Sequence, residues 1–263
     1  MKKMSYFLLM LAIMLVTTGC GQDKLSNGKT PLVQMNESKQ LKIGINPTVP
    51  LYASLDKNGN LSGFDIDVIE EVAKRLGVKT KYYFSNGDSL FAGLSSKRYD
   101  VATSHMEIVK ERQKMYDFSK PYQETNTVIV EKSEQKKPLN LNNLKGASIT
   151  LPITSYYASL ARNYKMYVMQ GETFESGMID LENGKSKYMI FDKDVVQRYI
   201  ADKQINDLKI SYTFPEKQQI GMMFRKGNTD LVTKVNEKLN EMENDGTIKR
   251  LTDKWFTGQV SVN

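Results

Sequence analysis

The sequence has almost no cysteine or histidine, and this scarcity excludes several kinds of chemistry. Among its 263 residues, Cys20 is the one cysteine and His105 the one histidine. The chain after Cys20 therefore has no disulfide framework and no thiol nucleophile. A metal site would have to use carboxylates alone, and no clustered ligand motif occurs, so we expect no metal and no other cofactor.

The sequence also lacks the motifs of ATP hydrolysis and of serine hydrolases. It contains no GxxxxGK[ST] phosphate loop, so the chain cannot hydrolyse ATP itself, and no serine lies in a GxSxG-like elbow. The formal net charge is +7, but no basic run is interleaved with aromatic residues, so nucleic acid is not an expected partner. A modest basic excess suits a surface near anionic lipid or a polyanionic wall.

The one long apolar run extends from Tyr6 to Val16, directly after Lys2 and Lys3. A positive start, a short apolar core and small residues before Cys20 are typical of a secretory signal, too short to span a membrane as a stable helix. The position of Cys20 resembles the lipobox of bacterial lipoproteins, whose thiol is lipidated and becomes the new N-terminus. Thr17 departs from the leucine usual there, and the alternative is a plain signal peptide with an incidental cysteine.

The region after this signal is expected to begin with a tether. Residues 20–40 are rich in Lys, Ser, Asn, Gly and Gln, and such a composition buries little and predicts a flexible segment. From Leu41 onward, strand and helix patterns alternate. The expected strands are Leu41–Ile45, Lys81–Phe84, Val101–Thr103, Thr127–Lys132, Ser148–Leu151, Tyr188–Phe191 and Ile220–Phe224. This alternation predicts α/β structure with parallel sheets flanked by helices.

The expected helices follow a spacing in which apolar residues share one face. They are Phe64–Leu76 with Gly77 at its end, Leu90–Ser95, Tyr156–Asn163, Phe174–Asn183, Val195–Asp202, a helix with Leu231 and Met242 on its apolar face, and a last short one carrying Trp255. The two α/β sets, joined by extended segments, predict two lobes with a cleft. Ligands bind outside the carboxyl ends of strands in such sheets, where Ser104–Arg112, Thr154–Tyr156 and Asp192 fall.

Arg112 is the most informative residue of this set. It follows the strand Val101–Thr103 and precedes the aromatic-rich sequence DFSKPY, which ends at Tyr122. A planar guanidinium held in this way makes two parallel charge-assisted bonds to one carboxylate, which a lysine does not reproduce. The alternative is a solvated surface charge among neighbouring charged residues.

Several landmarks in order resemble family 3 of the bacterial extracellular solute-binding proteins, the receptors of polar amino-acid ABC importers. They are the GFDIDV sequence from Gly63, the Asp100–Tyr122 stretch, Leu144-Lys145-Gly146, the FRKG turn from Phe224, and Asp245-Gly246-Thr247 followed by Lys254-Trp255-Phe256. The likeness covers essentially the whole chain from Leu41.

The resemblance implies a type II periplasmic-binding-protein-like clamshell, with two lobes and two hinge crossings. It places residues 41–126 and 220–263 in lobe one and residues 127–219 in lobe two, after a signal peptide at 1–19 and the tether at 20–40. The chain would be a monomer on the extracytoplasmic face of the cell membrane, anchored through Cys20. It would capture an amino acid or related zwitterion by closure of the lobes. A permease and an ATPase would be its partners.

The resemblance also implies roles for individual residues. Arg112 matches the family arginine that binds the ligand α-carboxylate, while Thr154 and Ser155 match hydroxyl residues at a helix N-terminus that contacts the same group. Asp192 matches the acidic residue that pairs with the ligand ammonium. The alternative role for Asp192 is the N-cap of the following helix, which Asp194 could fill instead.

Other cleft positions depart from the family pattern. Glu107 stands where Ser or Thr is usual, and His105 where a hydroxyl residue or glycine is commoner, so both, together with Ser104, are candidate ligand contacts. Aromatic residues usual at two further positions are replaced here by Val49 and Gly87. Tyr52 is then the candidate aromatic wall, and Asn46 stands where receptors for cationic amino acids often carry an acid. Asn46 favours a neutral ligand, whereas Glu107 and His105 favour an additional donor or cation.

Three alternatives stay open at this point. In the first, Glu107 faces solvent at the cleft rim rather than the ligand and has no role in binding. In the second, the chain is a cleft enzyme of the same fold that resembles cyclic-acid dehydratases, with Glu107 as a general acid whose pKa is raised by desolvation. As a third possibility, the chain is a solute sensor or adhesin that does not take part in transport.

Overall fold

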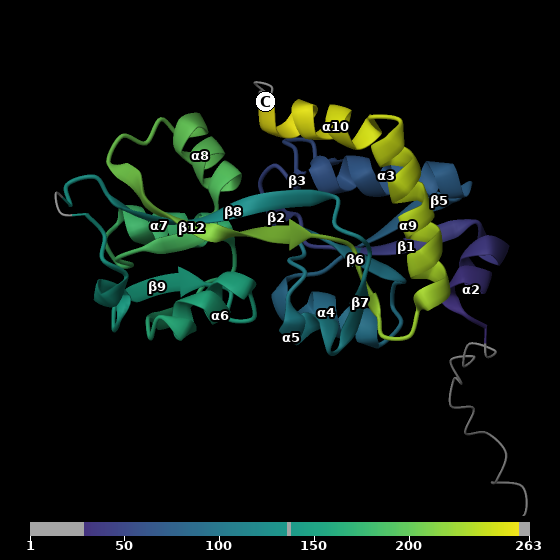
Figure 1. Ribbon diagram of the computed structural model, residues 1–263, viewed down its shortest axis with the longest axis horizontal. Helices are drawn as coiled ribbons and strands as arrows, with labels where there is room; N and C mark the ends of the chain where they lie inside the picture. The colour runs from purple at the N-terminus through teal and green to yellow at the C-terminus, as the bar shows by residue number, and fades with distance from the viewer. Residues whose placement is uncertain (1–28, 136–137, 258–263) are drawn as a thin grey trace, which may run out of the picture. The chain divides into compact units, whose positions relative to one another are not determined.

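The computed structural model describes residues 29–135 and 138–257, which form an α/β fold (Figure 1). The expected signal peptide and Cys20 lie outside these residues. Within the described part of the chain, no helix is both long enough and apolar enough to cross a membrane. Two groups of sheets and helices are present, which we call lobe one and lobe two.

Lobe one is built on a five-stranded sheet in the order β5-β1-β6-β13-β7. The strands are β5 (Lys79–Phe84), β1 (Gln40–Ile45), β6 (Val101–Thr103), β13 (Met223–Arg225) and β7 (Tyr116–Phe118). β1 pairs in parallel with β5 and β6, whereas β13 pairs antiparallel with β6 and β7. The expected parallel sheet is therefore mixed, because β13 enters lobe one from lobe two and runs against its neighbours.

Helices on the faces of this sheet complete lobe one: α3 (Phe64–Leu76), α4 (Gly87–Ser95), α5 (Lys110–Gln113), α9 (Thr229–Asn244) and α10 (Thr247–Thr252), followed by a π-helical turn at Asp253–Thr257. The apolar face of α3 is buried, and the helix ends at Gly77, whose φ of 69° is the left-handed conformation that glycine adopts without strain. Trp255 is buried, and its Nε1 donates to Asp67.

The prediction of a flexible tether over residues 20–40 is wrong for its last part, from residue 31 onward. Pro31–Ser38 forms helix α2, which packs against β1 and α9, and Gln40 already belongs to β1. Met35 is buried and Leu32 packs against the core, so two apolar side chains in a polar segment are enough to fix this helix to lobe one.

A small antiparallel sheet is formed by the part of the chain that follows β1 and precedes α3. Its strands are β2 (Thr48–Val49), β3 (Ala53–Leu55) and β4 (Leu61–Ser62). The turn from β3 to β4 is held by Asp56, whose Oδ1 accepts from the backbone N–H of Asn58 and Asn60 at 2.8 Å. Asp, Asn and Gly form such turns readily, because an Asx side chain accepts from nearby backbone N–H groups and Asn and Gly tolerate a positive φ.

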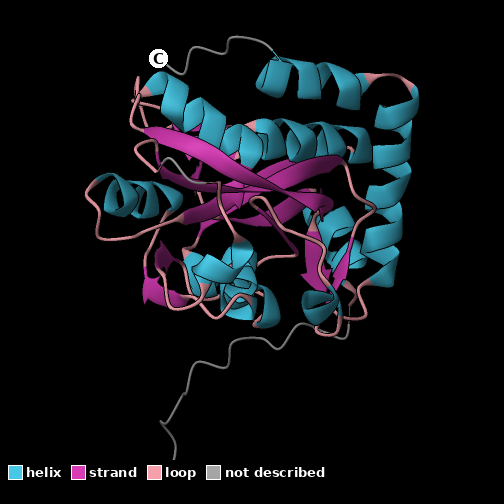
Figure 2. Ribbon diagram, turned by 60° about the vertical axis from the view of Figure 1, so that its left-hand side comes forward, coloured by secondary structure: helices cyan, strands magenta, loops and turns pink. Residues whose placement is uncertain are grey.

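Lobe two contains an antiparallel sheet in the order β11-β8-β12 and a parallel pair β10-β9. The strands are β8 (Gln123–Lys132), β9 (Ser148–Leu151), β10 (Tyr167–Gln170), β11 (Met189–Asp192) and β12 (Leu208–Ile220). The helices are α6 (Tyr156–Asn163), α7 (Phe174–Glu182) and α8 (Lys193–Asp202), with a 3₁₀ turn at Leu141–Leu144. Figure 2 shows helices above and below the central strands.

Strands β8 and β12 run between the lobes (Figure 1). They pair from Leu208 with Lys132 to Ile220 with Gln123, and the register shifts between Thr213 and Lys217. These long strands are the two crossings implied by the family resemblance. β12 was not expected from the sequence, because Pro215 and a mainly polar half-exposed stretch hide its strand pattern.

Candidate ligand-binding site

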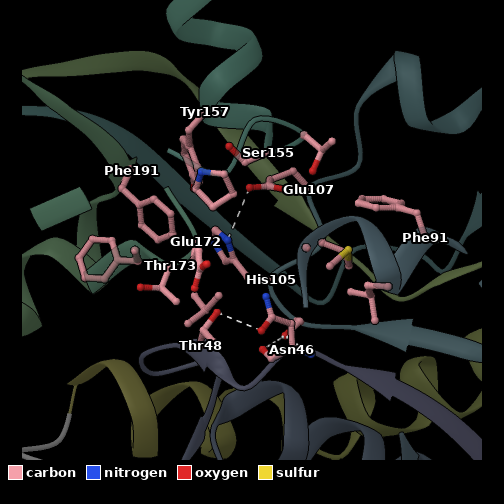
Figure 3. Close-up of a pocket in the computed structure, with 18 of the residues that line it drawn as sticks. Asn46, Thr48, Phe91, His105, Glu107, Ser155, Tyr157, Glu172, Thr173 and Phe191 are labelled. Atoms are coloured by element: carbon pink, nitrogen blue, oxygen red, sulfur yellow. Dashed lines mark hydrogen bonds and ion pairs between the residues drawn. The ribbon is translucent and has the colours of Figure 1, made fainter. Parts of the chain in front are cut away.

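A cavity of about 90 Å³ lies between residues of the two lobes (Figure 3), and we call it the inner cavity. Lobe one contributes residues from the end of β1, the start of α4 and the segment after β6, including Asn46, Ser104, His105, Glu107 and Arg112. Lobe two contributes residues before α6 and α7 and at the end of β11. These are the carboxyl ends of strands, where the sequence predicted a cleft.

A larger groove of about 630 Å³ adjoins the inner cavity, and we call it the outer groove. It is lined by α4, α5 and the residues after α5 on one side and by α6 on the other. Phe91, Arg112 and Thr154 line both the groove and the inner cavity. Arg112 therefore lies where the two spaces meet.

Arg112 belongs to the single turn of α5 and is not a solvated surface charge. Its side chain is 12% exposed, and its guanidinium lies over the ring of Phe91 at 5.5 Å. The Nη1 atom donates to Oε2 of Glu107 at 2.6 Å and to the carbonyl oxygen of the same residue at 3.2 Å. Arg112 thus faces the cleft as expected, but one of its terminal nitrogens already holds a carboxylate of the protein.

Glu107 points inward, so the alternative that it faces solvent is wrong. Its side chain is 5% exposed, and its Oε1 atom lies 3.6 Å from Nδ1 of His105. The backbone of Glu107 forms a β-bridge with Ile220, at the end of the crossing strand β12. The segment that holds Arg112 and Glu107 is therefore attached directly to the hinge.

His105 extends from lobe one to lobe two. Its Nε2 atom lies 3.0 Å from Oδ2 of Asp192, and its ring packs 4.2 Å from the ring of Tyr52 and nearly parallel to those of Tyr157 and Phe191. The backbone of His105 has a φ of 56°, and its N–H donates to Oδ2 of Asp65 at 2.6 Å. This left-handed conformation is one that histidine adopts more readily than most residues.

The electrostatic surroundings of His105 favour the charged imidazolium. Burial lowers the pKa of His105, but the hydrogen bond to Asp192 and the charges of Asp192, Glu107 and Asp65 outweigh it, so the pKa is raised. Burial raises the pKa of Asp192, and the bond and charge of His105 outweigh that effect, so the pKa of Asp192 is lowered. With a carboxylate near each ring nitrogen, both nitrogens act as donors.

Asp192 ends β11 and is fully buried. Its Oδ1 accepts from the backbone N–H of Asp194 and Val195, so Asp192 itself is the N-cap of α8. Its Oδ2 accepts from the hydroxyl of Tyr52 at 3.1 Å and faces Nε2 of His105. Four donors surround the two carboxylate oxygens, which is the full capacity of an ionised carboxylate.

Two of the residues expected to contact the ligand lie outside the lining of the inner cavity. Asp192 does not line the inner cavity, because His105 lies in front of it, so the expected pairing of Asp192 with a ligand ammonium is not the arrangement seen here. Tyr52 is fully buried behind the cavity and is no aromatic wall. The aromatic lining comes from other residues: Phe91, Tyr157, Phe174 and Phe191.

The remaining expected residues do line the inner cavity. Ser155 is the N-cap of α6, where its Oγ accepts from the N–H of Ala158 at 3.1 Å, and Thr154 precedes it. Asn46 donates from its backbone N–H to Oγ of Ser104 at 3.2 Å. The cavity wall is thus mostly hydroxyl, amide and aromatic, as suits a small polar ligand with an apolar portion.

Charges of alternating sign run across the cleft from Arg112 through Glu107 and His105 to Asp192. The first three belong to lobe one and the last to lobe two. Both residues expected to recognise a zwitterion, Arg112 and Asp192, are thereby paired with side chains of the protein itself. Sequence reasoning identified all four residues but not these pairings.

Glu172 also lines the inner cavity and was missed by sequence reasoning. It precedes Thr173, the N-cap of α7, and its side chain is exposed. Figure 3 shows it on the side of the cavity that carries Thr173 and Phe191. No local pattern marks this glutamate, because one acid in a polar loop is indistinguishable from a surface charge.

Comparison with known proteins agrees with this architecture. Residues 41–258 match the model of the bacterial extracellular solute-binding proteins, family 3. The L-cystine-binding protein TcyA of Bacillus subtilis is 32% identical over 99% of this chain and 100% of its own length. The L-cystine-binding protein TcyJ of Escherichia coli K12 is 30% identical over 88% of this chain and 87% of its own.

Solved structures with the same fold include receptors with bound amino acids. A mutant of the arginine-binding protein of T. maritima superposes with a TM-score of 0.80 at 29% identity, over 86% of this chain and 99% of that one. An ancestral arginine-binding protein bound to arginine superposes with a TM-score of 0.77 at 32% identity, over 83% of this chain and 98% of that one. Taken with the two-lobe fold and the cleft, these likenesses identify the chain as a member of family 3 of the bacterial extracellular solute-binding proteins, with the type II clamshell fold.

Proposed function

We propose that this receptor captures an amino acid for an ABC importer and delivers it to a membrane permease driven by a separate ATPase subunit. The observation that carries the proposal is the position of Arg112, which lines both the inner cavity and the outer groove between the lobes. The curated relatives that bind cystine support an amino-acid ligand, and so do the neighbours that hold arginine or glutamine.

Arg112 binds the ligand carboxylate with the donors that Glu107 leaves free. A guanidinium has five N–H donors, and among the described residues the hydrogen bonds of Arg112 run from Nη1 alone. Its Nη2 and Nε atoms form the second edge of the fork, which suits a bidentate carboxylate. Thr154 and the N-terminus of α6, where Ser155 is the cap, lie across the same space and supply further donors.

Closure of the lobes encloses the ligand. In this proposal lobe one comprises residues 41–126 and 220–263, lobe two comprises residues 127–219, and β8 and β12 bend where their register shifts. The contact of His105 in lobe one with Asp192 in lobe two holds the lobes together in the closed arrangement. Rigid-body closure about two strands is an established form of ligand response in two-lobe receptors.

The protein is held at the extracytoplasmic face of the cell membrane through lipidated Cys20. The support is the sequence pattern of a positive start, an apolar run and small residues before the cysteine. The mature chain would begin at Cys20, and the segment up to Pro31 would connect the anchor to α2.

Catalysis is not part of the proposed function. One structural neighbour, the ancestral amino-acid-binding protein AncCDT-1, is described as a precursor of cyclohexadienyl dehydratase, with a TM-score of 0.79 at 26% identity. A general acid needs a carboxyl group that is free to reach the substrate, whereas Oε2 of Glu107 already accepts a 2.6 Å bond from Arg112. The curated relatives reported above are binding proteins.

A direct test is a binding screen on the purified chain from residue 21 onward. Thermal shift and calorimetry are measured with L-cystine, L-arginine and L-glutamine, and the solute is recovered and analysed after incubation. We expect at least one of the three to raise the melting temperature and to be recovered unchanged. Turnover of the solute would indicate an enzyme, and no binding by any of the three would contradict the proposed receptor function.

A further inference from the structure

A ligand ammonium group has no place on Asp192 in this cleft. The two backbone N–H groups of α8 occupy Oδ1, and the Tyr52 hydroxyl and the His105 ring occupy Oδ2. Asp192 is also fully buried and does not line the inner cavity. A zwitterionic ligand needs a different carboxylate for its positive end.

The charges around the inner cavity do not cancel. Arg112 is paired with Glu107, and His105 is paired with Asp192, so these four groups are neutral together when His105 is protonated. Glu172 is the further charged residue of the cavity lining, and it adds one negative charge. A cavity with an uncompensated carboxylate favours a ligand that brings a cationic group to it.

Glu172 is available for such a group. Among the residues that the structure describes, no hydrogen bond or ion pair of its side chain is found, whereas Glu175 in the first turn of α7 pairs with Lys203 at 3.1 Å. Glu172 lies on lobe two, and Arg112 lies on lobe one. A ligand that bridges them contacts both lobes and so favours closure.

We propose that Glu172 binds the ammonium group of the amino-acid ligand while Arg112 binds its carboxylate. This assignment rests on the proposed receptor function and deepens it, because it moves the recognition of the positive end from Asp192 to the loop before α7. Water screens the exposed Glu172 carboxylate in this structure, and the attraction grows as the bound ligand displaces water from the cleft. Asp192 then serves to cap α8 and to hold His105.

The test compares two matched substitutions by calorimetry with L-cystine, L-arginine and L-glutamine. Glu172→Gln removes the charge at the cavity, and Glu175→Gln removes a charge from the first turn of α7 outside it, so both act alike on the helix dipole. We expect Glu172→Gln to weaken binding of the solute that wild type binds by about tenfold or more. Glu175→Gln should bind that solute like wild type.

A second comparison changes the solute instead of the protein. The analogue that carries a hydroxyl in place of the α-ammonium should bind wild type more weakly than its parent amino acid, and Glu172→Gln should discriminate much less between the two. If Glu172→Gln binds the amino acid with wild-type affinity, or keeps the full discrimination, the assignment of Glu172 is wrong while the receptor function stands. If wild type binds none of the three amino acids, both proposals fail.

Discussion

The Nε2 atom of His105 lies 3.0 Å from the Oδ2 atom of Asp192, which bonds a residue of lobe one directly to a residue of lobe two. The two residues are 87 positions apart in the sequence. The contact is buried, with side chains 2% and 0% exposed. It therefore stabilises a closed arrangement by means of the protein's own side chains.

This contact should make the stability of the ligand-free protein depend on pH. The pKa of His105 is raised, so its contribution is fully present below the ordinary value of 6.5 and is lost as the pH rises through the raised value. The pKa of Asp192 is lowered, so its contribution is present above 3.8 and is lost as the pH falls through the lowered value. The pair contributes most between these two ordinary values, and wild type should lose melting temperature from pH 6 to pH 9.

The control for this pH effect is His105→Gln. Glu107 and Asp65 also face the ring in both proteins; burial raises the pKa of Asp65 above its ordinary value and those of Tyr52 and Tyr157 well above theirs. The variant should therefore show a flatter profile over pH 6–9. The absolute melting temperature of the variant also reflects the φ of 56° at this position. The two proteins are therefore compared by the slope of melting temperature against pH and not by the melting temperature itself. Equal slopes in the two proteins would contradict a charged His105.

Arg112→Ala should abolish measurable binding of every amino acid in calorimetry, because the ligand carboxylate then enters a closing cleft without its partner. Arg112→Lys is the informative companion. It keeps a positive charge beside the buried Glu107 but lacks the second edge of the fork, so it should fold like wild type and still bind weakly. Wild-type affinity in either variant would rule out Arg112 as the carboxylate site.

Glu107→Ser should change which amino acids bind and should also destabilise the fold. The sequence alone predicts only the first effect, but the structure places the Glu107 carboxylate between Arg112 and His105. Removing one partner of a buried ion pair costs about 3 kcal/mol. Urea unfolding should report that loss, and a panel of amino acids should report the altered preference. Unchanged stability would mean that the Arg112 pairing contributes little.

Met35→Ala should lower the free energy of unfolding by about 2 kcal/mol, because this buried side chain fixes α2 to lobe one. Val33→Ala, on the exposed side of the same helix, should cost well under half as much. Urea titration of both variants tests whether the segment expected to be a tether is part of the folded domain. Equal, small losses would restore the tether interpretation for residues 31–38.

Cys20→Ala should release the protein from the membrane fraction of an expressing bacterium, and incorporation of labelled palmitate should be lost at the same time. The physical reason is that acyl chains supply about 0.8 kcal/mol per buried CH₂. If the wild-type protein is recovered in the medium without an acyl chain, the plain signal peptide is the correct interpretation.

Local patterns predicted much of the fold because they depend on neighbours in sequence. The expected ends of Val101–Thr103, Ser148–Leu151 and Tyr156–Asn163 agree with β6, β9 and α6. The long strand β12 was missed, since its partner β8 lies far away in the chain and its own sequence is mainly polar. The antiparallel entry of β13 depends on that same distant pairing.

The sequence predicted which residues lie at the site better than it predicted the contacts among them. The sequence identified Arg112, Glu107 and His105, but not that they pair with one another or with Asp192. Hydrogen bonds across two lobes depend on side-chain positions that no local spacing encodes. Glu172 illustrates the same limit, because its importance comes from the cavity it lines and not from its neighbours in sequence.

Helix α2 determines which lobe is attached to the N-terminal segment of the chain. It packs on β1 and α9, both of lobe one, and it is the first described helix after the segment that leads from Cys20. A pull on the N-terminal chain therefore acts first on lobe one, while the chain reaches lobe two through the strands β8 and β12. With Cys20 fixed in a membrane, lobe two would be the body that swings, and lobe one the stationary side of the cleft.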